Sequence, residues 1–198
     1  MRWPVIFLML GLSACNMAYS ERLLFQATAS EPAIALRPGI WVLECPDTPP
    51  ALREPCRERG YAVVTERGLS FEDHGELEAP QAVALFDGVP VILQMPLEMQ
   101  PGHQAFAFAG TSIISRDDLG RPTELRWWPV LCGPPNVNDE QDIRFPTLEP
   151  WPGMQMVGDD CIATTSQAVR QAATLSRPAD GGVRFHWVGT GVGRLPTP

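Results

Sequence analysis

The stretch that decides the fold is QAVALFDGVPVILQM, residues 81–95. Two short apolar runs, 81–86 and 89–95, flank the dipeptide Asp87-Gly88. Asp-Gly is typical of tight turns between antiparallel strands, because its backbone preferences match the right-handed twist of the flanking strands. Residues 81–95 therefore predict a β-hairpin.

Short runs of the same kind recur on both sides of this hairpin. They lie at residues 40–43, 61–64, 69–71, 104–108, 111–116, 123–131 and 183–188. Glu66-Arg67-Gly68, Ala109-Gly110 and the segment 117–120 are the turns expected between neighbouring runs. Successive hairpins predict an antiparallel meander, in the form of a curled sheet, a sandwich or a small barrel.

One helix is expected, at about residues 164–176. Thr164-Thr165-Ser166-Gln167 fits a capping box, and an apolar stripe at Ala168, Val169, Ala172 and Leu175 follows it. Pro178 stands just beyond the expected end. The fold class is therefore α+β and mainly β.

Composition excludes some partners. The 198 residues include 21 prolines and 17 glycines, which disfavour long helices, while aliphatic and aromatic residues suffice for a core. The net charge is -8, and all 15 basic residues are arginines that form no basic block. We therefore expect neither nucleic acid nor an electrostatically bound anionic membrane as a partner.

The N-terminus carries a targeting signal. Met1-Arg2 is a short basic start, and the apolar run 3–12 is too short to span a bilayer. Leu12-Ser13-Ala14-Cys15 then resembles the lipobox of bacterial lipoproteins. The resemblance implies that residues 1–14 are a signal peptide that is removed. It also implies that Cys15 carries a diacylglycerol and a further acyl chain such as palmitate, which anchor it in a membrane.

The same resemblance implies a location and a domain plan. An Asp after the acylated cysteine retains Gram-negative lipoproteins in the inner membrane, and Asn16 stands here instead. We therefore expect the outer membrane, on its periplasmic side. Residues 15–38 are interpreted as the acylated N-terminus and a tether, although Leu23-Leu24-Phe25 could dock as an edge strand. We expect residues 39–198 to form a single β-rich domain.

Four cysteines remain besides Cys15, namely Cys45, Cys56, Cys132 and Cys161. An even number in an exported chain predicts two disulfides. Of the three possible pairings we favour Cys45–Cys56 and Cys132–Cys161, since bridges between cysteines near in sequence are the easiest to close. A four-cysteine zinc site is the alternative, but the chain has no C-x-x-C spacing.

The sequence assigns no catalytic residue, metal or cofactor. His74, His103 and His186 belong to no nucleophile motif, and the Ser-x-x-Lys motif requires a lysine that the chain lacks. The acidic turn around His74 suits a solvated loop better than a cation site. A hydrolase that uses His74 or His103 with acidic neighbours is kept as the alternative function.

Tryptophans are the candidate binding residues. Adjacent residues of a strand face opposite ways, so Trp127 and Trp128 cannot both enter one core. We expect Trp128 and Trp151 to form a binding surface for an envelope protein or a glycan. The preferred function is a non-enzymatic binding or structural module. The mature domain also loosely resembles small periplasmic β-barrel inhibitors of proteases and lysozyme, which implies enzyme inhibition as a further alternative.

Overall fold

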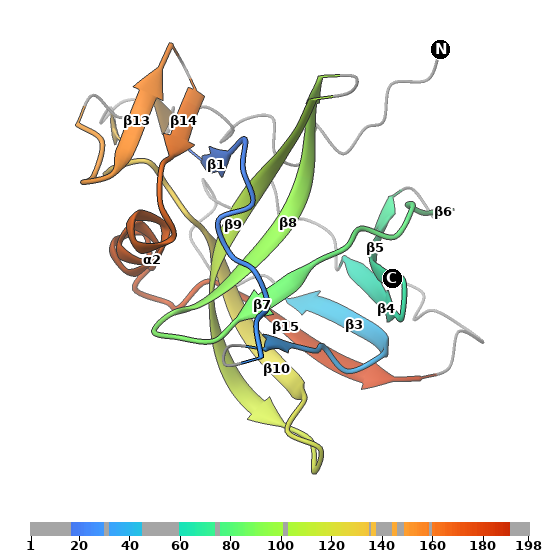
Figure 1. Ribbon diagram of the computed structural model, residues 1–198. Coiled ribbons are helices and arrows are strands. Elements are labelled where there is room, and N and C mark those ends of the chain that lie inside the picture. The colour runs from blue at the N-terminus through green and yellow to red at the C-terminus, as the bar shows by residue number, and fades with distance from the viewer. Residues whose placement is uncertain are drawn as a thin grey trace.

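The computed structural model describes residues 17–29, 32–44, 60–73, 76–100, 103–134, 136–137, 144–145, 149–158 and 160–190. Nearly all of their regular structure is β, with one helix in the described part (Figure 1). The strands are β1 Ala18–Ser20, β2 Ala33–Ile34, β3 Gly39–Glu44, β4 Tyr61–Thr65, β5 Gly68–Asp73, β6 Glu76–Leu77, β7 Ala84–Phe86, β8 Val91–Gln100, β9 His103–Arg116, β10 Pro122–Pro129, β11 Asn136–Val137, β12 Arg144–Phe145, β13 Met154–Val157, β14 Asp160–Ala163 and β15 Val183–Gly189. The helix is α2, Ser166–Leu175.

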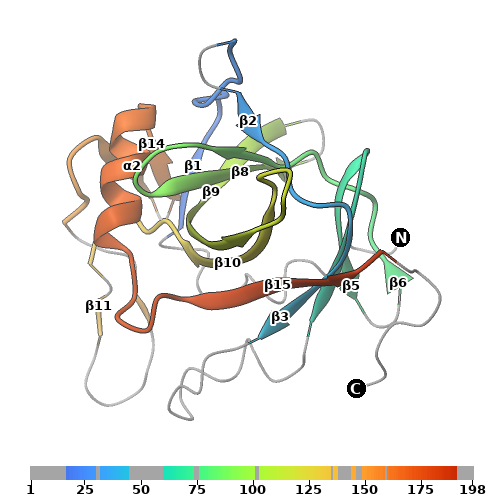
Figure 2. The same cartoon turned by 90° about the horizontal axis from the view of Figure 1, so that it is seen from below.

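The main sheet curls back on itself. Its strands follow the order β7-β8-β9-β10-β15-β3-β4-β5, and every neighbouring pair in this series is antiparallel. A single bridge between Leu69 of β5 and Gln81, with N···O distances of 3.0 and 2.8 Å, then links the last strand to the segment that leads into β7. We call this curled part of the sheet the barrel (Figure 2). The predicted mainly β, antiparallel fold class is confirmed.

The hairpin at residues 81–95 is present, with a longer turn than the sequence predicts. Phe86 pairs with Ile92, so the connection includes Val89 and Pro90 besides Asp87-Gly88. Proline has no N–H to donate to a strand partner, which explains why β8 begins after it. The carbonyls of Asp87 and Pro90 instead accept hydrogen bonds from Arg170 of α2.

The turn predicted at Ala109-Gly110 is wrong. Residues 103–116 form one continuous strand, β9, which pairs with β8 on one edge and with β1 and β10 on the other. Gly110 serves close packing instead. A Cβ there would lie 2.5 Å from indole atoms of Trp128, which stands opposite it on β10. Only glycine fits at this position without displacing the indole.

Helix α2 matches the predicted segment, but its cap lies one residue later than the capping box implies. The hydroxyl of Thr165 accepts from the N–H of Ala168 at 3.1 Å, which makes Thr165 the N-cap residue. The hydroxyl of Thr164 donates instead to the carbonyl of Gly153 at 2.9 Å, which ties the start of the helix to β13. At the other end, Ser176 is the C-cap residue, and its backbone N–H donates a hydrogen bond to the carbonyl of Ala172.

The segment expected to be a tether is part of the fold. Strand β1 lies between β9, to which it is antiparallel, and β14, to which it is parallel. Phe25 is 6% exposed, and the side-chain amide of Gln94 both donates to its carbonyl (3.1 Å) and accepts from its N–H (3.2 Å). The alternative that residues 23–25 dock on the sheet is thus closer to the structure, although they form no strand.

The structure contains the predicted disulfide between Cys132 and Cys161, whose Cα atoms are 5.6 Å apart. It joins the chain after β10 to strand β14, beside the start of α2. Both cysteines are fully buried. Cys45 and Cys56, of the second predicted bridge, lie outside the described residues.

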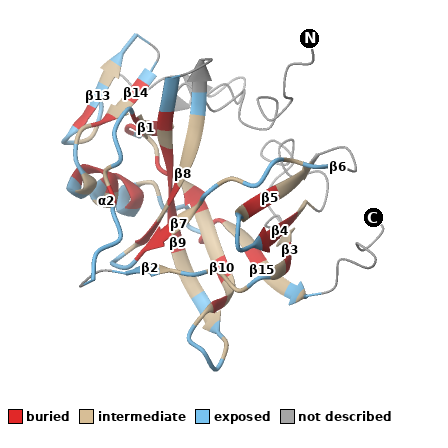
Figure 3. Ribbon diagram, turned by 45° about the vertical axis from the view of Figure 1, so that its right-hand side comes forward, coloured by how far each residue is buried: buried red, intermediate tan, exposed pale blue. Residues whose placement is uncertain are grey.

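Two apolar cores lie on opposite faces of β8 and β9, because Ile92 and Phe108 belong to one core whereas Leu93 and Thr111 line the barrel pocket. Buried residues are accordingly found both in α2 and β9 and in β4 and β5 (Figure 3). The helix-side core consists of Ala18, Phe25, Phe86, Ile92, Phe108, Val130, Cys132, Met154, Cys161, Ala163, Ala168, Val169, Ala172 and Ala173. The barrel core consists of Trp41, Ala62, Val64, Leu69, Leu125 and Phe185, with half-buried neighbours such as Trp127 and Trp187. Within the described part of the chain, no helix has the length and hydropathy needed to cross a membrane.

Candidate ligand-binding pocket

A pocket of about 30 Å³ lies inside the barrel. Side chains from seven strands and from the segment before β3 surround it, because alternate residues of every barrel strand point inward. The lining residues are Leu36, Leu43, Leu69, Phe71, Leu85, Leu93, Met95, Thr111, Leu125, Trp127 and Phe185. All but Thr111 are apolar or aromatic, as expected for the interior of a small barrel that side chains fill.

Thr111 is the exception in this lining. It stands on β9 between Val91 of β8 and Trp127 of β10, and it is 1% exposed. Its Oγ1 has no hydrogen-bond partner. Leaving a buried hydroxyl without a partner costs roughly 1–3 kcal/mol, so such groups are rare in folded proteins. Thr111 thus leaves one buried hydroxyl of the barrel wall without a hydrogen bond, whereas the surface of the pocket itself is apolar.

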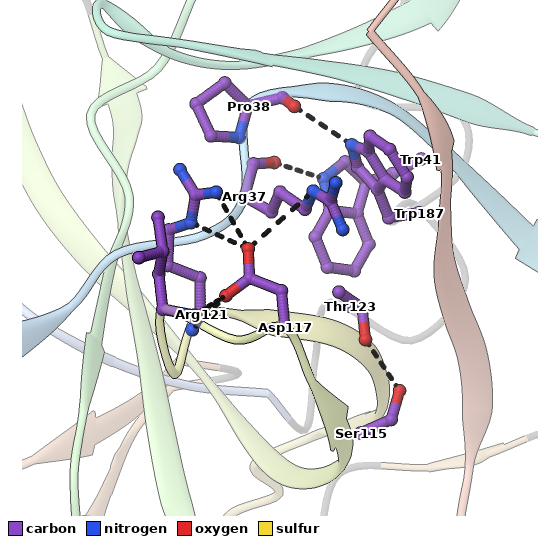
Figure 4. Close-up of polar contacts among 9 residues, drawn as sticks. Arg37, Pro38, Trp41, Ser115, Asp117, Arg121, Thr123 and Trp187 are labelled. Atoms are coloured by element: carbon purple, nitrogen blue, oxygen red, sulfur yellow. Dashed lines mark hydrogen bonds and ion pairs between the residues drawn. The ribbon is translucent and has the colours of Figure 1, made fainter.

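One end of the barrel is crossed by the segment between β2 and β3. Strand β2 pairs with β7, and β3 is the fifth strand after β7 in the order of the sheet. Residues 35–38, which join β2 to β3, must therefore pass from one wall of the barrel to the opposite one. Two indoles hold this segment (Figure 4). Trp41 Nε1 donates to the carbonyl of Arg37 and Trp187 Nε1 donates to that of Pro38, both at 2.9 Å.

The Arg37 side chain completes the closure. Its guanidinium carbon lies 3.5 Å from the centroid of the Trp187 ring, and its Nε lies 3.8 Å from Oδ2 of Asp117 (Figure 4). Guanidinium groups bind well to aromatic faces. This contact places a cation outside the apolar pocket, beside Leu36 in sequence, and fixes the segment that carries both residues.

Asp117 organises the turn between β9 and β10. Its carboxylate accepts hydrogen bonds from the Arg121 side chain at 2.8 and 2.9 Å and from the N–H groups of Leu119 and Arg121. Desolvation raises the pKa of this carboxyl, but the hydrogen bonds from Arg121 and Leu119 and the charge of Arg121 outweigh that effect. The pKa is therefore lowered from its ordinary value.

A second charged cluster lies on the outer face of β3, β10 and β15, away from the pocket. Arg184 donates to Glu124 at 2.8 Å and to Glu44 at 2.7 Å. The hydrogen bond from Arg184 lowers the pKa of Glu124. The Nδ1 atom of His186 is buried, lies 3.8 Å from Glu44 Oε1 and makes no hydrogen bond. Because Arg184 already engages both carboxylates, the cluster is interpreted as an ion-pair network across the three strands.

The predicted binding surface is not assembled. Trp128 is 1% exposed, and its Nε1 donates to the carbonyl of Ala173 of α2 at 2.7 Å. The prediction that it lies at the surface is wrong, because α2 covers the face of β10 that Trp128 shares. Trp151 is half-buried against the helix-side core, and its N–H donates to Cys132 O at 2.8 Å. The two tryptophans thus belong to the packing around α2.

The other residues singled out in the sequence are separated. His103 is exposed at the start of β9. His74 and Cys15 lie outside the described residues. Among the residues that the structure describes, no group of three or more His, Cys, Asp or Glu is placed to hold a metal ion.

Sequence reasoning missed Thr111 and Arg37. Thr111 stands in a run that reads as an ordinary strand, and threonine is common in strands. The polar residue on the inward face was the available signal, since Thr111 shares the register of Trp127. Arg37 offered no comparable signal, because its partners Asp117 and Trp187 are far away in sequence.

Comparisons with protein-family models, curated proteins and solved structures give no match for this chain.

Proposed function

We propose that the protein is a lipoprotein of the Gram-negative cell envelope, anchored through Cys15 in the outer membrane and facing the periplasm. In this proposal the folded part is a non-enzymatic binding module. The observation that supports the anchor is the place of β1, which pairs with β9 and β14 only three residues after Cys15. The sequence Leu12-Ser13-Ala14-Cys15 supplies the attachment site.

The fold is compatible with removal of residues 1–14. Strand β1 begins at Ala18, and the bridge from Met17 to Leu131 is the earliest described pairing. Cleavage before Cys15 leaves both in place. Because an extended residue spans at most about 3.5 Å, Cys15 can lie no farther than about 10 Å from Ala18. The anchored module would therefore rest close to the lipid headgroups, without a long tether.

This short link also gives the module an orientation. Ser20 of β1 pairs with Phe106, and β9 continues from there to Arg116. At about 3.3 Å per residue these ten steps cover roughly 30 Å. Figure 1 shows the β9–β10 turn at the opposite end of the molecule from β1. Leu119, on that turn, is 76% exposed and would face the periplasm.

The anchor is tested on the full chain expressed in a Gram-negative bacterium. We expect a mature N-terminal peptide that begins at a triacylated Cys15, identified by mass spectrometry, and recovery in the outer-membrane fraction. The Cys15→Ser chain should lose the acyl groups and leave that fraction. An unmodified Cys15, or a mature N-terminus elsewhere, contradicts the proposal.

The binding role is tested by cross-linking in intact cells. The chain has no lysine, so reagents that link amines are unsuitable. A photoreactive amino acid at Leu119 reports on the membrane-distal end, and one at Val157, which is 57% exposed in β13, is the matched control near β1. A discrete partner captured only from position 119 supports the proposal. Capture of abundant envelope proteins alone, equally from both positions, counts against it.

A further inference from the structure

We propose that the Cys132–Cys161 disulfide is a redox-dependent lock on strand β1. When the disulfide is formed, it keeps β1 between its two neighbours, and when it is reduced, the strand is released. The lock itself does not depend on attachment of lipid at Cys15. The pairing of β1, its small size and its place in the sheet lead to this proposal.

The disulfide joins the two segments that enclose the start of β1. On one side Ala18 is the pairing partner of Cys161 in β14. On the other side Met17 pairs with Leu131, which directly precedes Cys132. The two cysteines, whose Cα atoms are 5.6 Å apart, therefore connect both neighbours of β1 at the N-terminal end of this strand.

The disulfide also lies on the buried side of β1. Ala18, Cys132 and Cys161 are each 0% exposed and belong to the same helix-side core. Strand β1 is thus held by backbone pairing at both edges, and the disulfide covers it from the side of the core.

The contacts of β1 itself are few. The strand is three residues long, and two residues pair at each of its edges. Its two buried residues, Ala18 and Ser20, have small side chains, and the net contribution of a single hydrogen bond to stability is modest. Phe25 has its own hydrogen bonds to Gln94, so release concerns the residues before it.

The order of the sheet explains why the disulfide matters for β1. In the described part of the main sheet, β13 and β14 are connected to β9 through β1, in the order β13-β14-β1-β9 (Figure 1). Without the disulfide, β14 is free to move away from the segment after β10 once β1 leaves. With the disulfide, the two neighbours of β1 cannot separate, and the space that the strand occupies keeps its width.

Opening the lock is a thiol–disulfide exchange with a dithiol. One thiolate of the dithiol attacks a sulfur of the disulfide and forms a mixed disulfide, and its second thiolate then displaces the remaining cysteine. The two electrons and two protons end on Cys132 and Cys161 as thiols, and the dithiol becomes a disulfide. Because both cysteines are 0% exposed, the docked strand and the core around it shield the closed lock from this attack.

The lock determines how far the module reaches from the membrane, a consequence that rests on the proposed lipid at Cys15. With the lock closed, the link from Cys15 ends at β1. Release of residues 17–22 would lengthen this link by up to about 20 Å, at about 3.5 Å for each extended residue.

The test is hydrogen exchange, measured by mass spectrometry on the purified full chain in detergent micelles. It compares the oxidised parent, the parent reduced in urea with dithiothreitol and refolded in its presence, and the variant Cys132→Ala/Cys161→Ala. We expect the amides of residues 17–22 to exchange at least about tenfold faster in the second and third samples. The amides of β3, β4 and β15 should keep the rates of the oxidised parent, because the barrel core does not contain the disulfide.

Cys45→Ala/Cys56→Ala removes the other two cysteines of the folded part and is the matched control, which should leave the exchange of residues 17–22 unchanged. Unchanged exchange of these residues after reduction and in Cys132→Ala/Cys161→Ala overturns the proposal. Equal acceleration in β1 and α2 overturns it as well, since the disulfide would then stabilise the whole helix side. An unacylated Cys15 would contradict the anchor but leave these rates unaffected, so the two proposals fail separately.

Discussion

The helix-side core and the barrel interior lie on opposite faces of β8 and β9, yet their polar groups are satisfied differently. Around the helix-side core, the indole N–H of Trp128 reaches Ala173 O, and the amide of Gln94 pairs with both backbone groups of Phe25. In the barrel core, Thr111 Oγ1 remains unpaired beside a pocket. The buried Trp128 and Gln94 side chains of the helix side are thus hydrogen-bonded, whereas the barrel core contains an unpaired hydroxyl and a small cavity.

The largest expected effect compares the two adjacent tryptophans. Trp128→Ala should lower the free energy of unfolding by about 3–5 kcal/mol, because it empties a fully buried site and removes the bond to Ala173. Trp127→Ala should cost about half as much, since Trp127 is half-buried and already borders a pocket. Urea denaturation of both chains measures the difference. Equal losses would show that the two cores are packed alike.

The disulfide is the next test of the helix-side core. It closes a loop with a sequence separation of 29, for which the loss of chain entropy corresponds to about 3.5 kcal/mol. The double variant Cys132→Ala/Cys161→Ala should therefore unfold at a clearly lower urea concentration. Backbone amides of β3, β4 and β15 should remain protected from hydrogen exchange below that midpoint, because the barrel core does not contain the bridge. Loss of this protection together with the bridge would mean that the two cores are not independent.

Two threonines provide a matched pair of smaller effects. Thr165→Val removes the N-cap of α2 and should cost about 1 kcal/mol. Thr111→Val removes a hydroxyl that bonds to nothing, so stability should stay unchanged or rise by up to about 1 kcal/mol. Chemical denaturation of the two chains measures both values. A loss in Thr111→Val as large as in Thr165→Val would refute the difference between the two cores.

The smallest expected effect concerns acid pH at the closed end of the barrel. The pKa of Asp117 is lowered in the folded state, so its contribution to stability is complete above the ordinary value of about 4. That contribution is lost as the pH falls through the folded-state pKa. Asp117→Asn should therefore flatten the decline of stability below pH 4. Thermal unfolding at several pH values records this slope, and an unchanged slope in the Asp117→Asn chain would contradict the prediction.

The local elements were largely predictable. The Asp87-Gly88 turn, the strand at 123–131 and the helix with its apolar stripe all arise from residues close in sequence, and each is present. The prediction of a turn at Ala109-Gly110 was wrong because a glycine that permits close packing cannot be distinguished in sequence from one that permits a turn. The prediction of an exposed Trp128 was wrong for a different reason. The alternation of side chains along a strand shows that Trp127 and Trp128 face opposite ways, but it does not show which face a distant helix covers.

The sequence by itself determined that this chain is mainly β with one helix, because hydrophobic periodicity and turn residues act over a few positions. Among three possible pairings it also favoured the bridge between Cys132 and Cys161, which the structure contains. Only the tertiary structure decided that both faces of β9 are buried, that residues 18–25 complete the sheet, and that Thr111 faces an apolar pocket. These features depend on the curl of the sheet and on contacts between residues far apart in the chain, which no local pattern encodes.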